Sequence, residues 1–259
     1  MRSSEKIAGL SSKAARIYLF GVDTGVGKTL AAALLLWELR RRGERAAAVK
    51  PFAAGAHRDA RIFHRIQGGV LPWELVEPFY FKLPLTPMIA AELEGKQPAF
   101  KEVCARLEEA GRGLSWLIVE GCGGLLSPVA PDYDWLDIMR SAPGFPVLVA
   151  RDALGVLHQT LCAARALQSG AGAKAGMAVL SARKRQDLSA KWNAAALKRL
   201  LPAWSFWRMP WLGKAPERAL LSGNEEVAIH SGAMNAVEEL RARLLEGSKK
   251  KRIFLKKTY

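Results

Sequence analysis

The stretch RIYLFGVDTGVGKTLAAALLLWELRRR, residues 16–42, decides the fold class of this 259-residue chain. Its apolar run 17–22 has the length of a buried strand and leads directly into a glycine-rich loop. An apolar stretch of helix length, 29–42, follows and ends in three arginines before Gly43, as expected of a helix C-terminus. A strand, a glycine-rich loop and a helix in this order predict a phosphate-binding unit.

The loop carries the residue types that such a unit requires, namely Gly25, Val26, Gly27, Lys28 and Thr29. Glycine lets the backbone wrap closely around phosphate oxygens, and the N–H groups at the helix start point at the anion. The lysine reaches the β- and γ-phosphates of a nucleoside triphosphate, and the hydroxyl ligates Mg²⁺. Because Val22 stands where the usual pattern has its first glycine, we interpret the loop as a variant P-loop.

Further apolar runs of strand length alternate with longer amphipathic stretches at 46–52, 115–121, 145–150 and 175–181. This alternation predicts an α/β fold: a single P-loop NTPase-type domain over 15–247, with a mostly parallel, doubly wound sheet flanked by helices. The patterns also predict a helix over 156–170, capped by Gly170, and a closing amphipathic helix over 236–247. Residues 1–14 are predicted to be a flexible N-terminus and 248–259 a basic C-terminal tail.

Composition restricts the classes of function. Half of the residues are apolar, yet no run is long enough for a membrane span, and the N-terminal segment lacks the apolar core of a secretory signal. Three widely separated cysteines cannot form a disulfide framework. We therefore expect a cytoplasmic protein without membrane contact.

The formal charge of +15 would suit a nucleic-acid partner, but its distribution argues against that. Six basic residues lie in the tail 248–259, and three close the helix at 40–42, where basic residues are usually solvated. Nucleic-acid binding is thus not expected as the main function. Weak attraction of polyanions by the tail stays an alternative.

Charged residues follow two more of the predicted strands, where ligands bind in doubly wound sheets. Lys50 ends the run AAAV and is followed by Asp59 after a short loop, and Glu120 ends the run SWLIV just before a glycine-rich segment. A carboxylate at a strand tip beside glycines can hold a metal and leave room for a substrate. Taken singly, Lys50 could instead be a solvated strand end, Asp59 a helix N-cap and Glu120 a buried ion-pair partner.

Together these residues resemble the dethiobiotin synthetases of biotin biosynthesis. The matching segments lie in the family's order over about 16–215: GVDTGVGKT (21–29), VKP…G…DA (49–60), LPLTPMIAAELEG (83–95), VEGCGGLLSP (119–128), LGVLHQTL (154–161) and PWLG (210–213). The resemblance implies a homodimer with the active site at the subunit interface. It also implies the closure of a cyclic urea from 7,8-diaminopelargonic acid and CO2, with ATP and Mg²⁺; other nucleoside triphosphates stay open.

Carried over by position, the resemblance implies roles for individual residues. Lys28 and Lys50 are the implied catalytic cations, and Thr29, Asp59 and Glu120 the implied Mg²⁺ ligands. The implied nucleotide-binding residues are Gly25, Val26, Gly27, Lys28, Thr29, Glu120, Ser181, Pro210, Trp211 and Leu212. The implied substrate-binding residues are Lys50, Ala54, Gly123, Gly124, Gly155 and His158.

The chain departs from the family pattern near these ligands. Val22 and Ala54 stand where the family commonly has hydroxyl side chains. Ser181 ends the strand at which the family has an adenine-recognising Asn, and His158 lies in the helix start that commonly reads Asn-His. His158 could donate to a substrate or cap the helix. Two alternatives to dethiobiotin synthesis therefore stay open: a diverged enzyme that activates another carbamate or carboxylate, and a catalytically weak nucleotide-binding protein.

Overall fold

The computed structural model describes residues 14–213. Apart from Ala14, the predicted N-terminal segment 1–14 lies outside the described residues, as do the predicted helix 236–247 and the predicted tail 248–259.

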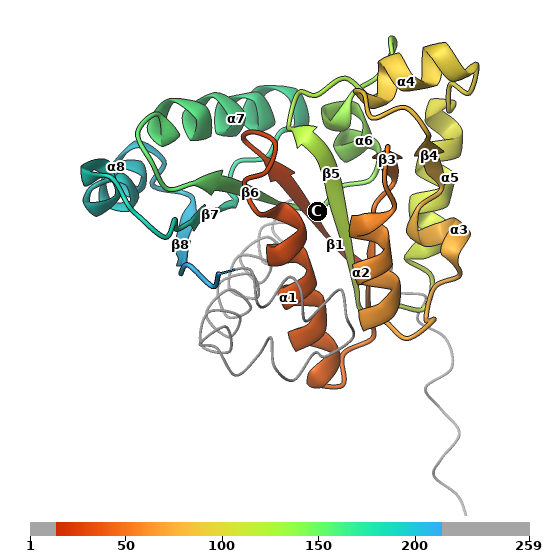
Figure 1. The fold of residues 1–259 in the computed structure, drawn as a ribbon, viewed down its shortest axis with the longest axis horizontal. Helices are drawn as coiled ribbons and strands as arrows, with labels where there is room; N and C mark the ends of the chain where they lie inside the picture. The colour runs from red at the N-terminus through yellow and green to blue at the C-terminus, as the bar shows by residue number, and fades with distance from the viewer. Residues whose placement is uncertain (1–13, 214–259) are drawn as a thin grey trace, which may run out of the picture.

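A parallel sheet forms the centre of the domain (Figure 1). Its six strands lie in the order β2-β5-β1-β6-β7-β8, and every neighbouring pair is parallel. The bounds are β1 Ala15–Gly21, β2 Ala46–Val49, β5 Trp116–Gly124, β6 Phe145–Arg151, β7 Met177–Ser181 and β8 Ser205–Met209. The predicted fold class, a mostly parallel α/β domain of P-loop type, is thereby confirmed.

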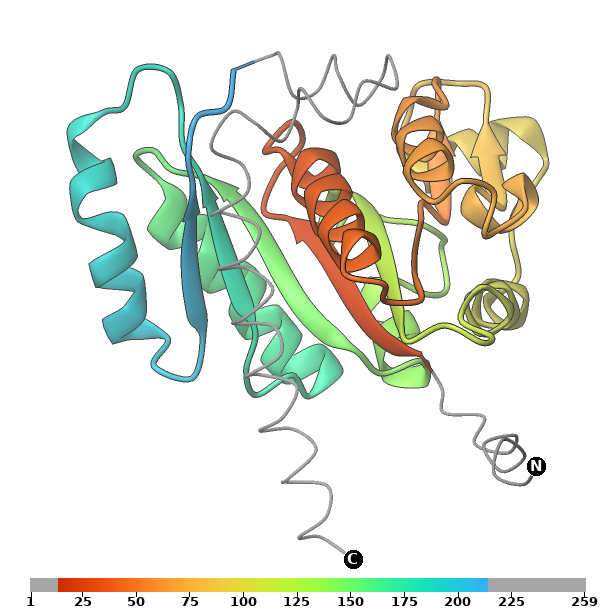
Figure 2. The ribbon, with the colours of Figure 1, turned by 90° about the horizontal axis from the view of Figure 1, so that it is seen from below.

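Helices cover both faces of this sheet, which explains why its strands are almost continuously apolar. Figure 2 shows α1 and α2 on one face and α6 and α7 on the other, with α8 along the edge strand β8. The bounds of these helices are α1 Lys28–Arg41, α2 Arg58–Ile66, α6 Trp135–Ser141, α7 Val156–Ala171 and α8 Asn193–Leu200. The strands β1, β2 and β6 are accordingly buried over nearly their whole length.

The predicted single strand 46–52 is wrong. The chain forms β2 up to Val49, turns, and resumes as β3, Phe52–Ala54, in a separate two-stranded parallel sheet with β4, Phe79–Phe81. The Lys50 N–H donates to the carbonyl of Val76 instead of to the main sheet (2.7 Å), and Pro51 has no N–H to donate. The remaining elements are α3 Trp73–Val76, α4 Pro87–Glu94, α5 Phe100–Ala110 and the 3₁₀ helix η1 Leu188–Lys191.

The predicted cap of α7 at Gly170 is also wrong, because the helix continues to Ala171 and Gly172 is the left-handed cap. Gly170 instead permits close helix packing, since a Cβ there would lie 2.5 Å from Cδ1 of Leu136 on α6. No helix within the described range is long and apolar enough to span a membrane. All three cysteines are free thiols.

The strand order brings the predicted site residues to one edge. β1 lies between β5 and β6, so the loops after these three strands meet at their common carboxyl end. Glu120 of β5 is in register with Leu19 of β1, two residues before the phosphate-binding loop begins. This is the place where chain crossovers diverge to opposite sides of the sheet and where doubly wound folds bind ligands.

Candidate functional site

The phosphate-binding loop joins the end of β1 to the first residue of α1. Gly25 and Gly27 have φ angles of 63° and 99°, which side chains other than glycine rarely adopt. Gly21 is required for a different reason: a Cβ there would lie 2.4 Å from the Asp23 carbonyl oxygen and 2.7 Å from Nζ of Lys28. The glycine that precedes Val22 therefore allows the close approach of backbone and lysine inside the loop.

Lys28 begins α1 and its ammonium group lies across the mouth of the loop. Nζ donates to the carbonyl of Gly123 (2.7 Å) and to that of Asp23 (3.2 Å). Burial, and then the nearby charge of Lys50, lower the pKa of Lys28. An anion in the loop would relieve both effects, because it offers the buried ammonium group a charged partner.

Lys50 bridges the two predicted metal-binding carboxylates. Its Nζ lies 2.7 Å from Oε1 of Glu120 and 2.9 Å from Oδ2 of Asp59. Burial disfavours the charged ammonium, but the two carboxylates outweigh this and raise the pKa of Lys50. Lys50 is thus a buried cation, and the alternative that it is a solvated strand end is wrong. The alternative that Asp59 is a helix N-cap is also wrong, because His57 is the N-cap of α2 and Asp59 lies in its first turn.

Glu120 is the most deeply buried member of this group. Burial raises its pKa, and the positive charge of Lys50 opposes that shift. The Thr29 hydroxyl donates to Oε1 (2.9 Å), whereas Oε2 is buried without a hydrogen-bond partner within the described residues. Glu120 is therefore a buried ion-pair partner, which was one of the two interpretations from sequence. Its second oxygen, Oε2, is in addition available to coordinate a cation.

These donors fit Mg²⁺ by their chemistry. The hydroxyl of Thr29 and the carboxylates of Asp59 and Glu120 are all hard oxygen ligands. In the part of the chain that the structure describes, no group of three or more His, Cys, Asp or Glu side chains is arranged so that it could hold a metal ion. Mg²⁺ commonly binds only one or two carboxylates and keeps several waters, so these three side chains are enough protein ligands for it.

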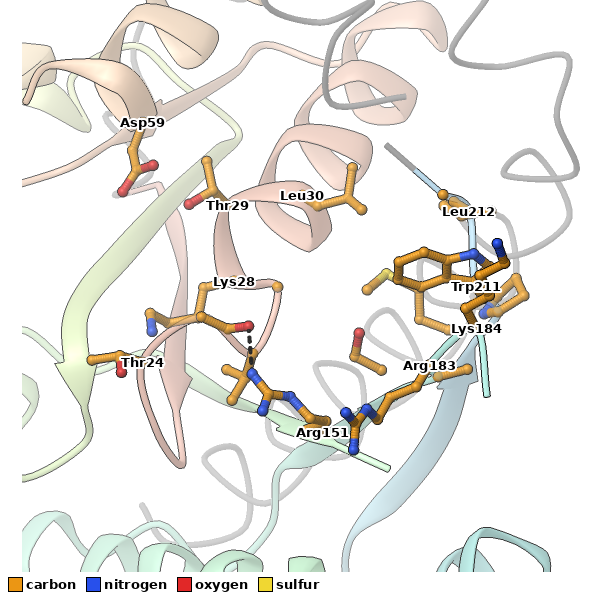
Figure 3. A pocket seen from close by; sticks show the side chains of 18 of the residues that line it. Thr24, Lys28, Thr29, Leu30, Asp59, Arg151, Arg183, Lys184, Trp211 and Leu212 are labelled. Atoms are coloured by element: carbon orange, nitrogen blue, oxygen red, sulfur yellow. Dashed lines mark hydrogen bonds between the residues drawn. The ribbon is translucent and has the colours of Figure 1, made fainter. Parts of the chain in front are cut away.

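A cleft of about 930 Å³ opens over the loop and extends toward β8 (Figure 3). The structure brings to it most of the predicted site residues: Gly25, Val26, Gly27, Lys28, Thr29, Lys50, Asp59, Glu120, Gly123, Ser181, Pro210, Trp211 and Leu212. Trp211 and Leu212 form its far wall, opposite the loop. The cleft thus has a phosphate end at the loop and a largely apolar end after β8.

Four predicted substrate-binding residues do not line this cleft: Ala54, Gly124, Gly155 and His158. Ala54 ends β3, and the N–H of Gly124 donates to the Ser127 hydroxyl (2.8 Å). Gly155 is the N-cap of α7, so the interpretation of His158 as a capping residue is wrong; its ring lies beside Sγ of Cys162 instead (3.7 Å).

The sequence prediction left out several of the lining residues, among them Arg151, Arg183, Lys184, Arg185 and Met209. Arg151 ends β6 and donates to the Gly25 carbonyl (3.2 Å). Arg183 follows β7 and Met209 ends β8. The rule that singled out Lys50 and Glu120, a charged residue just past a predicted strand, would also have found Arg151 and Arg183. It would not have found Met209, because β8 was not among the predicted strands.

The fold and the cleft define a nucleotide-binding protein of the P-loop class, with the loop, the lysine and the hydroxyl at the N-terminus of α1. The family model described as an AAA domain matches residues 15–225. An ATP-dependent dethiobiotin synthetase of Anaeromyxobacter dehalogenans (strain 2CP-C) is 35% identical over 217 residues, covering 80% of this chain and 95% of the relative. The corresponding protein of Escherichia coli K12 is 28% identical over 212 residues, covering 79% and 94%.

The chain belongs to the dethiobiotin synthetase family of P-loop enzymes, a family of ATP-dependent ligases of biotin biosynthesis. Among solved structures, the MinC:MinD cell division protein complex of Aquifex aeolicus has a TM-score of 0.54 at 14% identity, covering 88% of this chain and 96% of that one. That likeness concerns the fold alone.

Proposed function

We propose that the protein forms the ureido ring of dethiobiotin from 7,8-diaminopelargonic acid and CO2, with ATP and Mg²⁺. The observation that carries this proposal is the meeting of two ammonium groups, Lys28 and Lys50, with the carboxylates of Asp59 and Glu120 at the mouth of the phosphate-binding loop. A protein that only binds nucleotide needs fewer of these charges.

The proposed reaction has three steps. An amine of the substrate adds to CO2 and loses a proton to solvent, giving a carbamate. A carbamate oxygen attacks the γ-phosphorus, the bond to the bridging oxygen breaks, and ADP leaves. The second amine then attacks the carbamoyl carbon and expels phosphate, which closes the ring. Negative charge gathers between the phosphate and the carbamate, so the site must supply positive charge there.

This chain's own residues supply that charge. Lys28 and the N–H groups at the start of α1 face the phosphates, while Lys50 lies on the side of the cleft formed by β2 and β5. When bound, Mg²⁺ would neutralise charge on the β- and γ-phosphates, with Thr29, Asp59 and Glu120 as the proposed ligands. Because Lys50 now pairs with both carboxylates, its ammonium group must release at least one of them to reach the carbamate.

We also propose that the enzyme is a homodimer whose partner completes the substrate site. Two exposed leucines at the carboxyl edge of the sheet support this: Leu126, 60% exposed after β5, and Leu154, 86% exposed before α7. The predicted substrate residues Gly155 and His158 lie beside Leu154. Sedimentation velocity would test the proposal, since a Leu154→Glu variant should shift a dimer toward the monomer, and a wild type that is monomeric at all concentrations would contradict it.

A second candidate is a diverged enzyme that activates another carbamate or carboxylate. It is favoured by Val22 and Ala54, which stand where the family commonly has hydroxyl side chains near the reacting groups. A catalytically weak nucleotide-binding protein remains the third alternative. A cytoplasmic location stays a prediction.

One assay separates these candidates. Purified protein is incubated with diaminopelargonate, ¹³C-bicarbonate, Mg²⁺ and ATP, and the product is examined by mass spectrometry. The proposal expects one cyclic urea carrying one ¹³C atom per phosphate released, and no product with Lys28→Ala. Phosphate release that depends on a different amine or carboxylate would favour the diverged enzyme, and no phosphate release would favour the weak binder.

A further inference from the structure

A second group of cations lines the nucleotide cleft beyond the phosphate-binding loop. Arg151 at the end of β6 and Arg183, Lys184 and Arg185 after β7 all face the same space. In Figure 3 the Arg151 side chain points to the phosphate-binding loop, and Arg183 lies beside it. Neither the proposed phosphate site nor the proposed metal site uses any of these four side chains.

The chain segment that carries these cations is held in place by its neighbours. Ala182 N–H donates to the Met209 carbonyl (2.9 Å), and Gln186 accepts from Arg208 (2.7 Å). On the other side, the Asp187 carboxylate accepts from the N–H of Leu154 (2.9 Å). The 183–185 segment is thus tied to both β8 and the start of α7, which fixes its position along the cleft.

Two acidic residues of the adjoining segments, Asp152 and Asp187, are already engaged. Asp152 pairs with Arg208 (2.7 Å) and accepts from Asn193 (2.8 Å), and Asp187 is bound by Ser189 and Leu154. Within residues 14–213, Arg183, Lys184 and Arg185 have no acidic partner, and Arg151 contacts only the Gly25 carbonyl. Four like charges are therefore gathered without counter-charge, an arrangement that an anion would stabilise.

We propose that these cations form a second anion subsite, which recognises a phosphate on the 2′ or 3′ position of the ribose of a bound nucleotide. The proposal rests on nucleotide binding at the P-loop, as proposed above. Gly27 and Ser181 lie against each other in the wall of the cleft, since a Cβ on Gly27 would be 3.3 Å from the Ser181 Oγ. With the 5′-phosphates in the loop and the base near Trp211, the ribose would lie in the cleft next to these two residues. Arg151 and Arg183 flank that position.

Nucleotides that carry such an extra phosphate would occupy the ATP site and inhibit competitively. Arginine suits this task because its planar guanidinium group can bind phosphate through two hydrogen bonds at once. The four side chains are exposed, so water and salt will weaken each contact. We expect a gain in affinity of about tenfold from the added phosphate, the size of one charge-assisted hydrogen bond.

Calorimetric titration tests the proposal with three probes: ADP, and ADP carrying an additional phosphate at the 2′ or at the 3′ position. The wild type is compared with Arg183→Gln and with Arg112→Gln, which removes the same charge from an exposed residue at the end of α5. All titrations use Mg²⁺ and a salt concentration of about 0.1 M, where exposed charges are partly screened.

The proposal expects at least one of the two phosphorylated probes to bind the wild type and Arg112→Gln about tenfold more tightly than ADP does, and this gain to fall below about threefold in Arg183→Gln. Equal affinity of all three probes for the wild type would overturn the subsite while leaving nucleotide binding intact. A uniform weakening of every probe in Arg183→Gln, with the gain preserved, would overturn it too, because the cations would then act on the 5′-phosphates. Absence of ADP binding would overturn the proposed function as well.

Discussion

The ammonium group of Lys50 lies 2.7 Å from the Glu120 carboxylate, and the same group lies 2.9 Å from Asp59. One buried cation therefore neutralises the two carboxylates that are the proposed Mg²⁺ ligands. Lys50 and a metal ion would compete for the same oxygens, so binding of the metal and release of Lys50 toward the substrate are coupled. In the proposed site, Lys50 and the metal ion would thus take turns as the partner of the same carboxylates. Because Lys50 neutralises these carboxylates when no metal is bound, it is important for stability as well as for turnover.

Replacing Lys50 by methionine is expected to destabilise the fold. The substitution leaves Glu120 buried without its charge partner, and breaking a buried ion pair from one side costs about 3–5 kcal/mol. Chemical denaturation of Lys50→Met against the wild type measures this loss. The double variant Lys50→Met/Glu120→Gln should recover part of the stability and remain inactive, whereas additive losses would show that the two side chains act independently.

Replacing Lys28 by alanine should reduce turnover strongly and change the stability of the fold little. Its ammonium group donates only to backbone carbonyls at the mouth of the loop, so we expect a change in unfolding free energy within about 1 kcal/mol. Turnover should fall on the order of 100-fold or more, because a preorganised charge at the transferring phosphate is lost. Lys174→Ala, which removes an exposed lysine before β7, is the control. Near-normal turnover in Lys28→Ala would refute the assigned role.

Alanine at Gly21 tests why the variant loop keeps its glycine one position earlier than usual. The new Cβ would approach the Asp23 carbonyl and the Lys28 ammonium to less than any ordinary contact, so the loop has to shift. We expect nucleotide affinity to fall by about tenfold or more, together with a loss of stability of about 1–3 kcal/mol. Gly111→Ala is the matched control, because a Cβ there meets its neighbours at 3.4 Å or more. Unchanged nucleotide binding in Gly21→Ala would contradict this reading of the loop.

The loop and the main sheet could be predicted from sequence because their signals are local. A glycine-rich loop between an apolar run and a helix fixes β1 and α1, and the later apolar runs fix the positions of β5, β6 and β7. The division of 46–52 into β2 and β3 could not be predicted in this way. It depends on a long-range hydrogen bond from Lys50 to Val76, which no local pattern carries.

The candidate site likewise contains residues that the sequence could predict and residues that it could not. Lys28 and Thr29 belong to a contiguous motif, and Glu120 follows from its place at a strand end. The strand β8 was not predicted, because its sequence SFWRM contains no continuous apolar run, and the approach of Met209 to the cleft was missed with it. Sequence alone also could not show that Lys50 bridges Asp59 and Glu120, since that contact joins three elements.

The stability contributed by Glu38 should depend on pH. Burial opposes ionisation of this α1 side chain, but hydrogen bonds from Arg41 and Arg42 outweigh it and lower the pKa of Glu38. A carboxylate with a lowered pKa stabilises the fold above its unfolded pKa, and this contribution is lost as the pH falls through the folded value. Because both arginines are partly exposed, we expect Glu38→Gln to lose only about 1–2 kcal/mol at pH 7.

At about pH 3 the difference between the wild type and Glu38→Gln should shrink, since protonation removes the same charge from the wild type. Denaturation midpoints of the wild type and of Glu38→Gln at these two pH values measure this difference in stability. A difference that stays constant between neutral and acidic conditions would show that the ion pairs contribute nothing.

We propose that Lys28, Lys50 and the carboxylates of Asp59 and Glu120 converge on one triphosphate. A crystal structure with Mg²⁺ and a non-hydrolysable ATP analogue tests it most directly. We expect the triphosphate in the loop, the Lys28 ammonium on its terminal phosphates, the metal against Thr29 and at least one carboxylate, and Lys50 released from the other. A nucleotide bound elsewhere, or Lys50 still paired with both Asp59 and Glu120 beside a bound triphosphate, would contradict it.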